Sequence, residues 1–351
     1  MNDYHIRRKV ELLQGNHPLQ GRTPQRGDIK VRSNDYLCLA DHPHIIESEI
    51  AALRSGGHGD AVSRVWVHHE GDVTRGFEQR VAALMQGEDC VVCASGYTAN
   101  VGLIQAFASK DSPVYLDMKA HISLHEGVIS AGARAILFRH NEPQSLDKLL
   151  AQHGPGLVAV DALYSTDGDI APLAELVEVC ERHGAALIVD ETHSFGAQGP
   201  GGAGPRRRRG TFRARPLSHG GAVEGCPPAA AASSSPRAAT SNTSATRRWP
   251  AIFSTSVMQH EIAGFNAVLD VFQREDWRRD KLHANHAYLR QGLDDLGYNV
   301  SALEDADHRS GARRHPPDDE AGATRSKNAA CSGRYSFLRR RRRSAASSAS
   351  R

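Results

Sequence analysis

The sequence predicts an α/β protein whose sheet is mostly parallel and carries helices on both faces. Between residues 89 and 194, short apolar segments alternate with longer segments in which apolar residues recur at helical spacing. The short segments are apolar throughout, which is typical of strands buried on both faces of a parallel sheet. At 351 residues, the chain is long enough for one large domain and a smaller one.

The elements before this alternation are predicted from their spacing and their breakers. A polar arm opens the chain, and "IKVRSNDYLCLADHP" (29–43) predicts a short strand and a turn. "PHIIESEIAALRSGG" (43–57) and "VTRGFEQRVAALMQG" (73–87) predict amphipathic helices, and a glycine pair ends the first of them.

From residue 89 onward, strands and helices are predicted in strict alternation. The predicted strands are 89–95, 113–118, 133–140, 156–165 and 185–194. The predicted helices are 96–108, 122–132, 142–154 and 172–184. In such sheets a ligand lies beyond the carboxyl ends of the strands. The polar residues expected at those ends are the first site candidates: Ser95, His121, Ser165, Asp190 and His193.

Three of these candidates suggest a cofactor, and each has a plainer alternative. Ser95 opens a helix, where amides and the helix dipole can hold a phosphate, or it is an ordinary strand-to-helix turn. His121 can stack on an aromatic cofactor or serve as a structural histidine. Asp190 can pair with the protonated nitrogen of a pyridine ring, which makes the ring an electron sink, or it can cap a turn.

Other patterns in the sequence argue against a metal site and against a membrane-spanning segment. The six cysteines have irregular spacing, and Cys90 and Cys93 lack a second pair at zinc spacing, so we expect them to be buried strand residues. The glycine-rich run 199–204 predicts a turn rather than a nucleotide loop. The chain shows no signal-peptide pattern and no 18-residue apolar run, so a soluble cytoplasmic protein is expected.

Together, several segments resemble the α-oxoamine synthases, fold-type I pyridoxal-phosphate enzymes that join an acyl-CoA to an amino acid. The matching segments are "NDYLCLA", "ASGYTAN", "HISLHEG", "YSTDGDIAPLAEL" and "VDETHSFGAQGPGGAG". Within that family, "SNDYLCLADHP", "HGPGLVAVDALYST" and "WPAIFSTSV" are most similar to the quorum-sensing branch that makes α-hydroxyketone autoinducers. The resemblance covers residues 30–204 and 249–303.

The resemblance implies a domain plan and an activity. It implies an N-terminal arm (1–45), a large cofactor-binding domain (46–248) and a smaller α/β C-terminal domain (249–351) that is incomplete in this chain. The implied activity is a pyridoxal-phosphate-dependent acyl transfer that condenses an acyl-CoA with an amino acid or related amine to give an α-aminoketone for autoinducer synthesis. A biosynthetic relative such as 8-amino-7-oxononanoate synthase is the first alternative.

The resemblance also implies a role for individual residues. Ser95, Gly96 and Tyr97 would hold the cofactor phosphate, His121 would stack on the pyridine ring, and Asp190 would pair with the ring nitrogen. Ser165 and His193 would lie near the ring hydroxyl. Thr255 would contact the cofactor phosphate of the partner subunit in a homodimer, and Asn34 would lie on the substrate side. His121 and His193 are the implied catalytic residues.

The lysine that carries the cofactor in this family is missing. It is expected at residue 224, 34 residues past Asp190, where the chain has Glu224. No lysine occurs between Lys148 and Lys281, so we expect the chain as written to be inactive. Residues 205–248 hold nine arginines and one acidic residue, and 307–351 are also poor in large apolar residues, so disorder is expected in both.

Both segments have the character of shifted reading frames. Val223 to Cys226 is encoded GTN GAR GGN TGY, which one base later permits Ser-Lys-Ala, so a lysine codon can overlap Glu224 if that residue is encoded GAA. A shifted reading frame also explains why residues 205–248 keep the length that the family has between the two matching parts of the chain. The alternative is that the arginine runs are real and bind nucleic acid or an anionic surface, in a non-catalytic protein on a decayed enzyme scaffold. These runs lack interleaved aromatic residues, so no nucleic-acid partner is expected.

Overall fold

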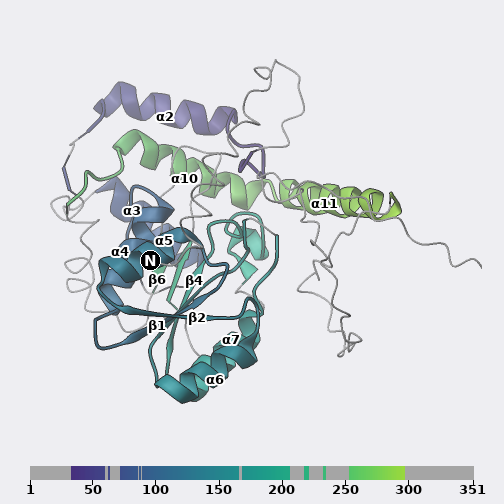
Figure 1. Cartoon of the computed structure of the whole chain (residues 1–351). Helices are drawn as coiled ribbons and strands as arrows, with labels where there is room; N and C mark the ends of the chain where they lie inside the picture. The colour runs from purple at the N-terminus through teal and green to yellow at the C-terminus, as the bar shows by residue number, and fades with distance from the viewer. Residues whose placement is uncertain are drawn as a thin grey trace, which may run out of the picture. The chain divides into compact units, whose positions relative to one another are not determined.

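The computed structural model contains a six-stranded sheet (Figure 1). The described residues are 33–59, 62–63, 72–85, 87, 89–165, 168–205, 217–220, 232–234 and 253–296. The chain divides after Ser33, which is the only described residue of the first unit, and all the elements described below belong to the second unit, Asn34–Arg351.

The sheet is parallel except at one edge. Its strand order is β2-β1-β3-β4-β5-β6. The strands are β1 (Pro113–Asp117), β2 (Arg134–Phe138), β3 (Leu157–Asp161), β4 (Ala186–Asp190), β5 (Leu217–Gly220) and β6 (Ala232–Ser234). Strands β1 to β5 pair in parallel and β6 pairs antiparallel with β5. The predicted α/β fold with a mostly parallel sheet is therefore confirmed.

Helices cover both faces of this sheet because alternate strand residues point to opposite sides. On one face, Leu157 and Ala159 of β3 join an apolar cluster with α4 (Gly96–Phe107) and α5 (Ile122–Ser130). On the other face, Val158 and Val160 pack with α6 (Pro143–His153) and α7 (Leu173–His183). Figure 1 shows the α4–α5 pair and the α6–α7 pair on opposite sides of the strands.

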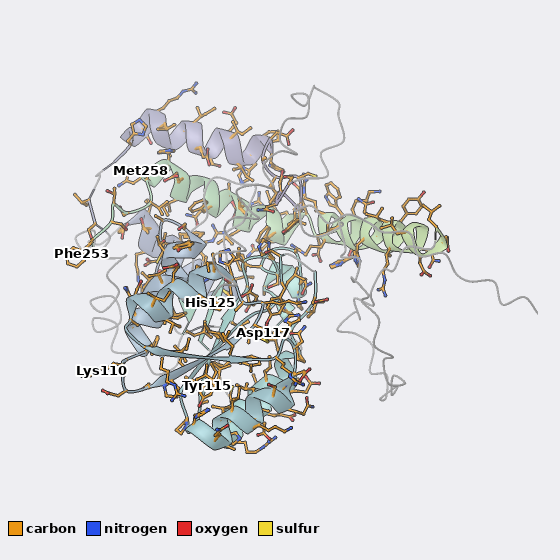
Figure 2. All side chains as sticks on the ribbon, in the orientation of Figure 1. Lys110, Tyr115, Asp117, His125, Phe253 and Met258 are labelled. Carbon is orange, nitrogen blue, oxygen red and sulfur yellow. The ribbon has the colours of Figure 1, made fainter. Side chains whose placement is uncertain are left out.

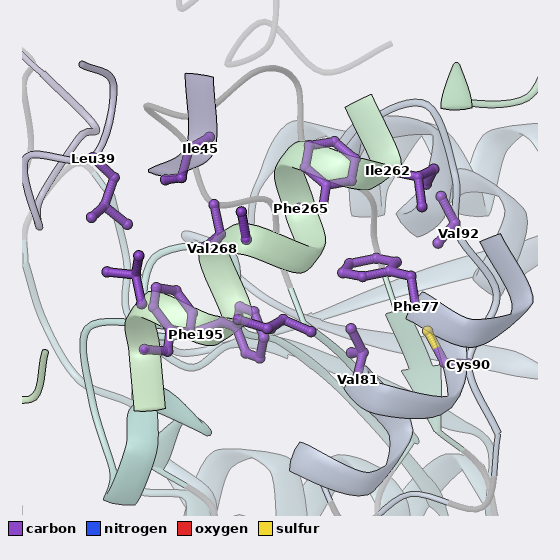
Figure 3. Close-up of a cluster of buried hydrophobic side chains, with 14 of the residues drawn as sticks. Leu39, Ile45, Phe77, Val81, Cys90, Val92, Phe195, Ile262, Phe265 and Val268 are labelled. Carbon is purple, nitrogen blue, oxygen red and sulfur yellow. The ribbon is translucent and has the colours of Figure 1, made fainter. Parts of the chain in front are cut away.

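A second apolar core lies outside the sheet, where α10 (Gln259–Arg274) packs against α2 (Pro43–Gly56) and α3 (Val73–Leu84). Figure 3 shows its centre, in which the aromatic rings of Phe77 and Phe265 lie 5.7 Å apart. Arg279, at the start of α11 (Trp277–Asp295), is buried and donates to the carbonyl oxygen of Phe272 at 2.6 Å. That contact holds the beginning of α11 to the end of α10.

The strand predicted at 89–95 is wrong. Residues 89–95 form no strand, although Cys90 and Cys93 are buried as expected. Side chains hold this backbone instead: Asp89 accepts from the N–H of Cys90, and Glu78 accepts from that of Val92. A strand needs a neighbour to complete its hydrogen bonds, and none pairs with this segment among the described residues. Residues 33–42 form the turn predicted within 29–43, whereas residues 29–32, which would open the predicted strand, lie outside the described residues.

Several predictions lie outside the described residues. These are most of the disorder and shifted reading frame predicted for 205–248 and 307–351, and the expected lysine position at Glu224. Within 205–248, residues 217–220 and 232–234 are described and form β5 and β6, so the predicted disorder does not hold for these two stretches. The division into an arm and two domains also stays a prediction.

Candidate active site

Three neighbouring strands end in buried aspartates at the same edge of the sheet. Asp117, Asp161 and Asp190 end β1, β3 and β4, and each side chain is at most 5% exposed. Burying an ionised carboxylate costs free energy unless hydrogen bonds compensate, and each of these carboxylates accepts bonds from the loops at that edge. The edge that parallel topology favours for ligands is therefore rich in fixed negative charge.

Asp190 is held by donors from two elements. Its Oδ1 accepts from the backbone N–H of Thr192 at 2.8 Å and from the Thr192 hydroxyl at 2.5 Å. Its Oδ2 accepts from the side-chain amide of Asn100, on α4, at 2.7 Å. Hydrogen bonds to the ionised form favour that form. Asp190 is thus fixed in position as a carboxylate at the end of a central strand.

Asn100 connects Asp190 to His121. The same amide nitrogen donates to the hydroxyl of Ser123 at 2.8 Å, and that hydroxyl lies 2.7 Å from Nδ1 of His121. His121 is the N-cap of α5, and its Nδ1 also accepts from the backbone N–H of Ser123. Because Nδ1 accepts, the hydrogen-bond pattern assigns the proton of the neutral ring to Nε2.

The start of α4 lies against the residue that supports Asp190. Ser95 is its N-cap and forms a capping box with Thr98. A side chain added at Gly96 would place its Cβ 3.4 Å from the Thr192 hydroxyl, in van der Waals contact. The first amides of a helix have no partner within the helix and attract anions. Tyr97 is 45% exposed, and partial burial raises the pKa of its hydroxyl.

His193 lies three residues past the end of β4 and contacts the segment that carries Asn34. Its Nδ1 is 2.7 Å from the hydroxyl of Tyr36. Tyr36 and Asn34 line a small pocket together with Thr192, Phe195 and Phe272. Because Thr192 also holds Asp190, this pocket adjoins the Asp190 network.

In the part of the chain that the structure describes, Ser165 and Thr255 belong neither to the Asp190 hydrogen-bond network nor to the pocket that Asn34 lines. Ser165 lies in the partly buried loop between β3 and α7, four residues past the end of β3. Thr255 is exposed and forms an isolated β-bridge with Ser63. It lies between Phe253 and Met258, both labelled in Figure 2. Their implied roles stay predictions.

Sequence reasoning missed four residues that build the site: Tyr36, Asn100, Ser123 and Thr192. Asn100 and Ser123 lie inside quoted motifs, but within predicted helices, where a polar residue is expected to face solvent. The sequence did hold one indication that Asn100 belongs to the site. It follows Gly96 by four residues and so lies one helical turn into α4, close to the helix end that was expected to bind a ligand. The contact between Tyr36 and His193 spans 157 residues and left no local signal.

The donor set fits pyridoxal phosphate, which is an anion at one end and a protonated pyridine nitrogen at the other. The amides at the start of α4 suit the phosphate, and the buried carboxylate of Asp190 suits the ring nitrogen. Among the described residues, no group of three or more His, Cys, Asp or Glu side chains is arranged to hold a metal ion. No described helix is both long enough and apolar enough to cross a bilayer.

Comparisons with known proteins agree with this chemistry. The family "aminotransferase class I and II" matches residues 27–306. CAI-1 autoinducer synthase of Vibrio campbellii is 32% identical over 313 residues, which are 85% of this chain and 76% of the relative. 8-Amino-7-oxononanoate synthase of Mycolicibacterium vanbaalenii is 33% identical over 281 residues, 76% of this chain and 71% of the relative.

Solved structures give the same result. Serine palmitoyltransferase from S. paucimobilis, solved with bound PLP and myriocin, superposes with a TM-score of 0.73 at 26% identity, covering 85% of this chain and 81% of that one. Another serine palmitoyltransferase structure with PLP superposes with a TM-score of 0.75 at 27% identity, covering 85% and 78% of the two chains. The chain therefore belongs to the aminotransferase class I and II family, and its relatives and structural neighbours place it among the α-oxoamine synthases.

Proposed function

We propose that this protein derives from a pyridoxal-phosphate-dependent acyltransferase that condenses an acyl-CoA with an amino acid or related amine. The observation that carries the proposal is the buried Asp190 carboxylate, which Asn100 and Thr192 hold beside the N-terminus of α4. A fixed carboxylate and an anion-binding helix end on one sheet edge match the two charged ends of this cofactor.

Each residue of the candidate site has a proposed role in binding the cofactor, which supplies an electron sink when bound. Asp190 holds a proton on the pyridine nitrogen, because a nearby carboxylate favours the charged form of that nitrogen. The first amides of α4, with Ser95 and Tyr97, bind the phosphate. His121 presents a ring held by Ser123, with its proton on Nε2.

His193 and Ser165 are proposed to face the ring hydroxyl from the ends of β4 and β3. The contact of His193 with Tyr36 fixes one of its ring nitrogens. Asn34 lines the adjoining pocket, which is the proposed position of the amine substrate. The acyl-CoA and amine substrates are inferred from the relatives, of which one is a CAI-1 autoinducer synthase and another an 8-amino-7-oxononanoate synthase. We assign this chain to the autoinducer branch, with the second activity as the alternative.

The missing lysine is proposed to result from a shifted reading frame. Strand β5 runs parallel to β4, with His219 opposite Asp190, so β5 ends at the edge that holds Asp190. Residue 224 follows the end of β5 by four residues and itself lies outside the described residues. A lysine encoded there would follow the strand next to Asp190. With Glu224 in its place, the chain as written has no amine at that position and is proposed to be inactive.

Assembly and location are also proposals. The implied role of Thr255 requires a second subunit, and the exposure of Thr255 leaves it accessible to one. We therefore propose a homodimer, and we propose a cytoplasmic location because acyl-CoA substrates are made there.

A condensation assay tests the proposed function. The frame-restored chain is mixed with pyridoxal phosphate, an acyl-CoA series and small amino acids, and release of the coenzyme A thiol is followed. We expect thiol release that requires both substrates, with Asp190→Asn at least about a hundredfold slower, because the ring nitrogen then loses its charged partner. Thiol release without an amine, or equal rates for Asp190→Asn, would overturn the proposal.

A further inference from the structure

A second group of charged side chains lies at the same sheet edge, on the side of β1 and β2. His140 follows β2 by two residues, and its Nδ1 lies 2.8 Å from Oδ1 of Asp117, at the end of β1. Its Nε2 lies 3.2 Å from Oδ2 of Asp169, in the loop after β3. Lys119 reaches the same oxygen of Asp169 at 3.2 Å. We call these four residues the His140 cluster; Figure 2 labels its Asp117.

The His140 cluster joins two loops that carry proposed cofactor-binding residues. One loop runs from Asp117 to His121, and Asp117 accepts from the backbone N–H of Lys119 within it. The other runs from Tyr164 to Asp169 and carries Ser165, and it is closed by a bond from the N–H of Tyr164 to the carbonyl oxygen of Asp169. His140 therefore bridges the loop before His121 and the loop that holds Ser165.

This bridge needs both ring nitrogens of His140 to carry protons. A carboxylate only accepts hydrogen bonds, and a neutral imidazole has only one N–H to give. A neutral ring would therefore leave one nitrogen lone pair facing a carboxylate oxygen. Burial lowers the pKa of His140, but the hydrogen bonds to Asp117 and Asp169 outweigh burial and raise that pKa above its usual value. The bond to His140 is also the main reason that the pKa of Asp169 is lowered.

The groups that face His140 come from each neighbouring element. They are Asp117 from β1, Lys119 from the loop after β1, and Asp169 and Tyr164 from the loop after β3. The ring of His140 meets that of Tyr164 edge-on, with centroids 4.5 Å apart. Burial raises the pKa of Tyr164 well above its usual value, so this hydroxyl stays neutral. The ammonium of Lys119 opposes the charge of His140 and shares its partner Asp169.

We propose that His140, with both nitrogens protonated, is a positioning residue that fixes the His121 and Ser165 loops and makes cofactor affinity depend on pH. The inference rests on the proposed function, since those loops matter through the cofactor. As pH rises and the ring loses a proton, one of its two bonds is lost and the Ser165 loop is released. As pH falls toward neutrality, the bridge closes and the cofactor binds more tightly.

The test compares His140→Gln with wild type in the chain as it exists. Glutamine keeps one side-chain N–H donor group but carries no charge and does not titrate in this range. The matched control is His183→Gln, because His183 makes a similar bond to Asp147, at 2.7 Å, on the outer helices. Dissociation constants for pyridoxal phosphate are measured by equilibrium dialysis from pH 5.5 to 9. The variant-to-wild-type ratio at each pH cancels the titration of the cofactor itself.

We expect His140→Gln to weaken binding by about tenfold at low pH and to match wild type at high pH, since loss of a charge-assisted bond is worth about that factor. His183→Gln should follow wild type at every pH. Asp169→Asn, which keeps the shape of the side chain, should shift the midpoint of the wild-type profile to lower pH. A ratio for His140→Gln that stays constant with pH would overturn the proposal.

A second measurement does not involve the cofactor. Amide hydrogen exchange of residues 162–171, corrected for the intrinsic effect of pH, should speed up in wild type as His140 deprotonates and should be fast at all pH values in His140→Gln. If this pattern is found while no chain binds pyridoxal phosphate, the proposed effect on cofactor affinity is refuted but the bridge stands, and the condensation assay on the frame-restored chain still tests the proposed function separately. If wild type and His140→Gln exchange alike at every pH, the bridge itself is refuted.

Discussion

Replacement of Asn100 by alanine should cost more stability than any change of a similar size on the protein surface. The Asn100 side chain is 1% exposed and its amide nitrogen makes two hydrogen bonds. One bond goes to the carboxylate of Asp190, and bonds of that kind contribute about 1.5–3 kcal/mol. The other goes to the hydroxyl of Ser123 and contributes about 0.5–1.5 kcal/mol. The sum predicts a loss of about 2–4.5 kcal/mol in the free energy of unfolding.

Urea denaturation measures this loss as a fall in the transition midpoint without a change of slope. Asn266→Ala is the matched control, because Asn266 also lies in a helix and makes two side-chain bonds, to Arg80 and to the carbonyl oxygen of Ile262, at a partly buried site. It should cost about 1 kcal/mol, since Arg80 is 36% exposed and keeps its bonds to Asp270 and to the backbone carbonyl oxygen of residue 266.

Affinity for pyridoxal phosphate separates the structural and functional consequences of the same change. Asn100→Ala releases the carboxylate of Asp190 and the hydroxyl of Ser123 together, so the cofactor should bind more weakly, by about tenfold or more. Asn266→Ala should leave that affinity unchanged. If Asn100→Ala costs no more than Asn266→Ala and binds the cofactor equally well, the network at the sheet edge does not have the role assigned to it.

Three further predictions follow from the site and the sequence. Tyr36→Phe removes the hydroxyl that lies 2.7 Å from Nδ1 of His193. In the frame-restored chain this change should lower kcat by about tenfold and leave cofactor affinity unchanged. If the variant and wild type have the same kcat, Tyr36 has no role in the reaction. Because the pKa of His140 is raised on folding, its stabilisation is fully present below about pH 6.5 and is lost as pH rises through the folded pKa. Urea midpoints of wild type should therefore approach those of His140→Gln at high pH, and a constant difference would contradict this. The coding DNA should carry compensating insertions or deletions near codons 205 and 248 and another near codon 306, with Glu224 encoded GAA; verified DNA with GAG would end the concealed-lysine argument.

The parallel sheet and its ligand edge could be predicted because they depend on local patterns. Uniformly apolar strands and intervening amphipathic helices predicted β1 to β4, and parallel topology brought Asp190 and His121 to one edge. The strand expected at 89–95 failed because strand formation also requires a neighbouring strand. The buried apolar residues of that segment were identified correctly, but its hydrogen-bond partners are Asp89 and Glu78 rather than a strand.

The connections within the site were harder to predict because they depend on tertiary contacts. Asn100 faces Asp190 only after α4 packs on β4, 90 residues along the chain. His140 was read as the end of a strand, and its bridge between Asp117 and Asp169 needs three loops to meet. Sequence spacing indicated which strand ends carry charge, whereas the pairing of those charges is decided by the folded loops.

The most direct test of the account is to find where pyridoxal phosphate attaches in the frame-restored chain. The protein is incubated with the cofactor, reduced with borohydride, digested and analysed by peptide mass spectrometry, alongside the chain as written. We predict one modified lysine in the restored chain, encoded across the present codon of Glu224, and no adduct in residues 205–248 of the chain as written. Attachment at Lys119, Lys148 or Lys281 instead, or a stable adduct between residues 205 and 248 of the unrestored chain, would contradict it.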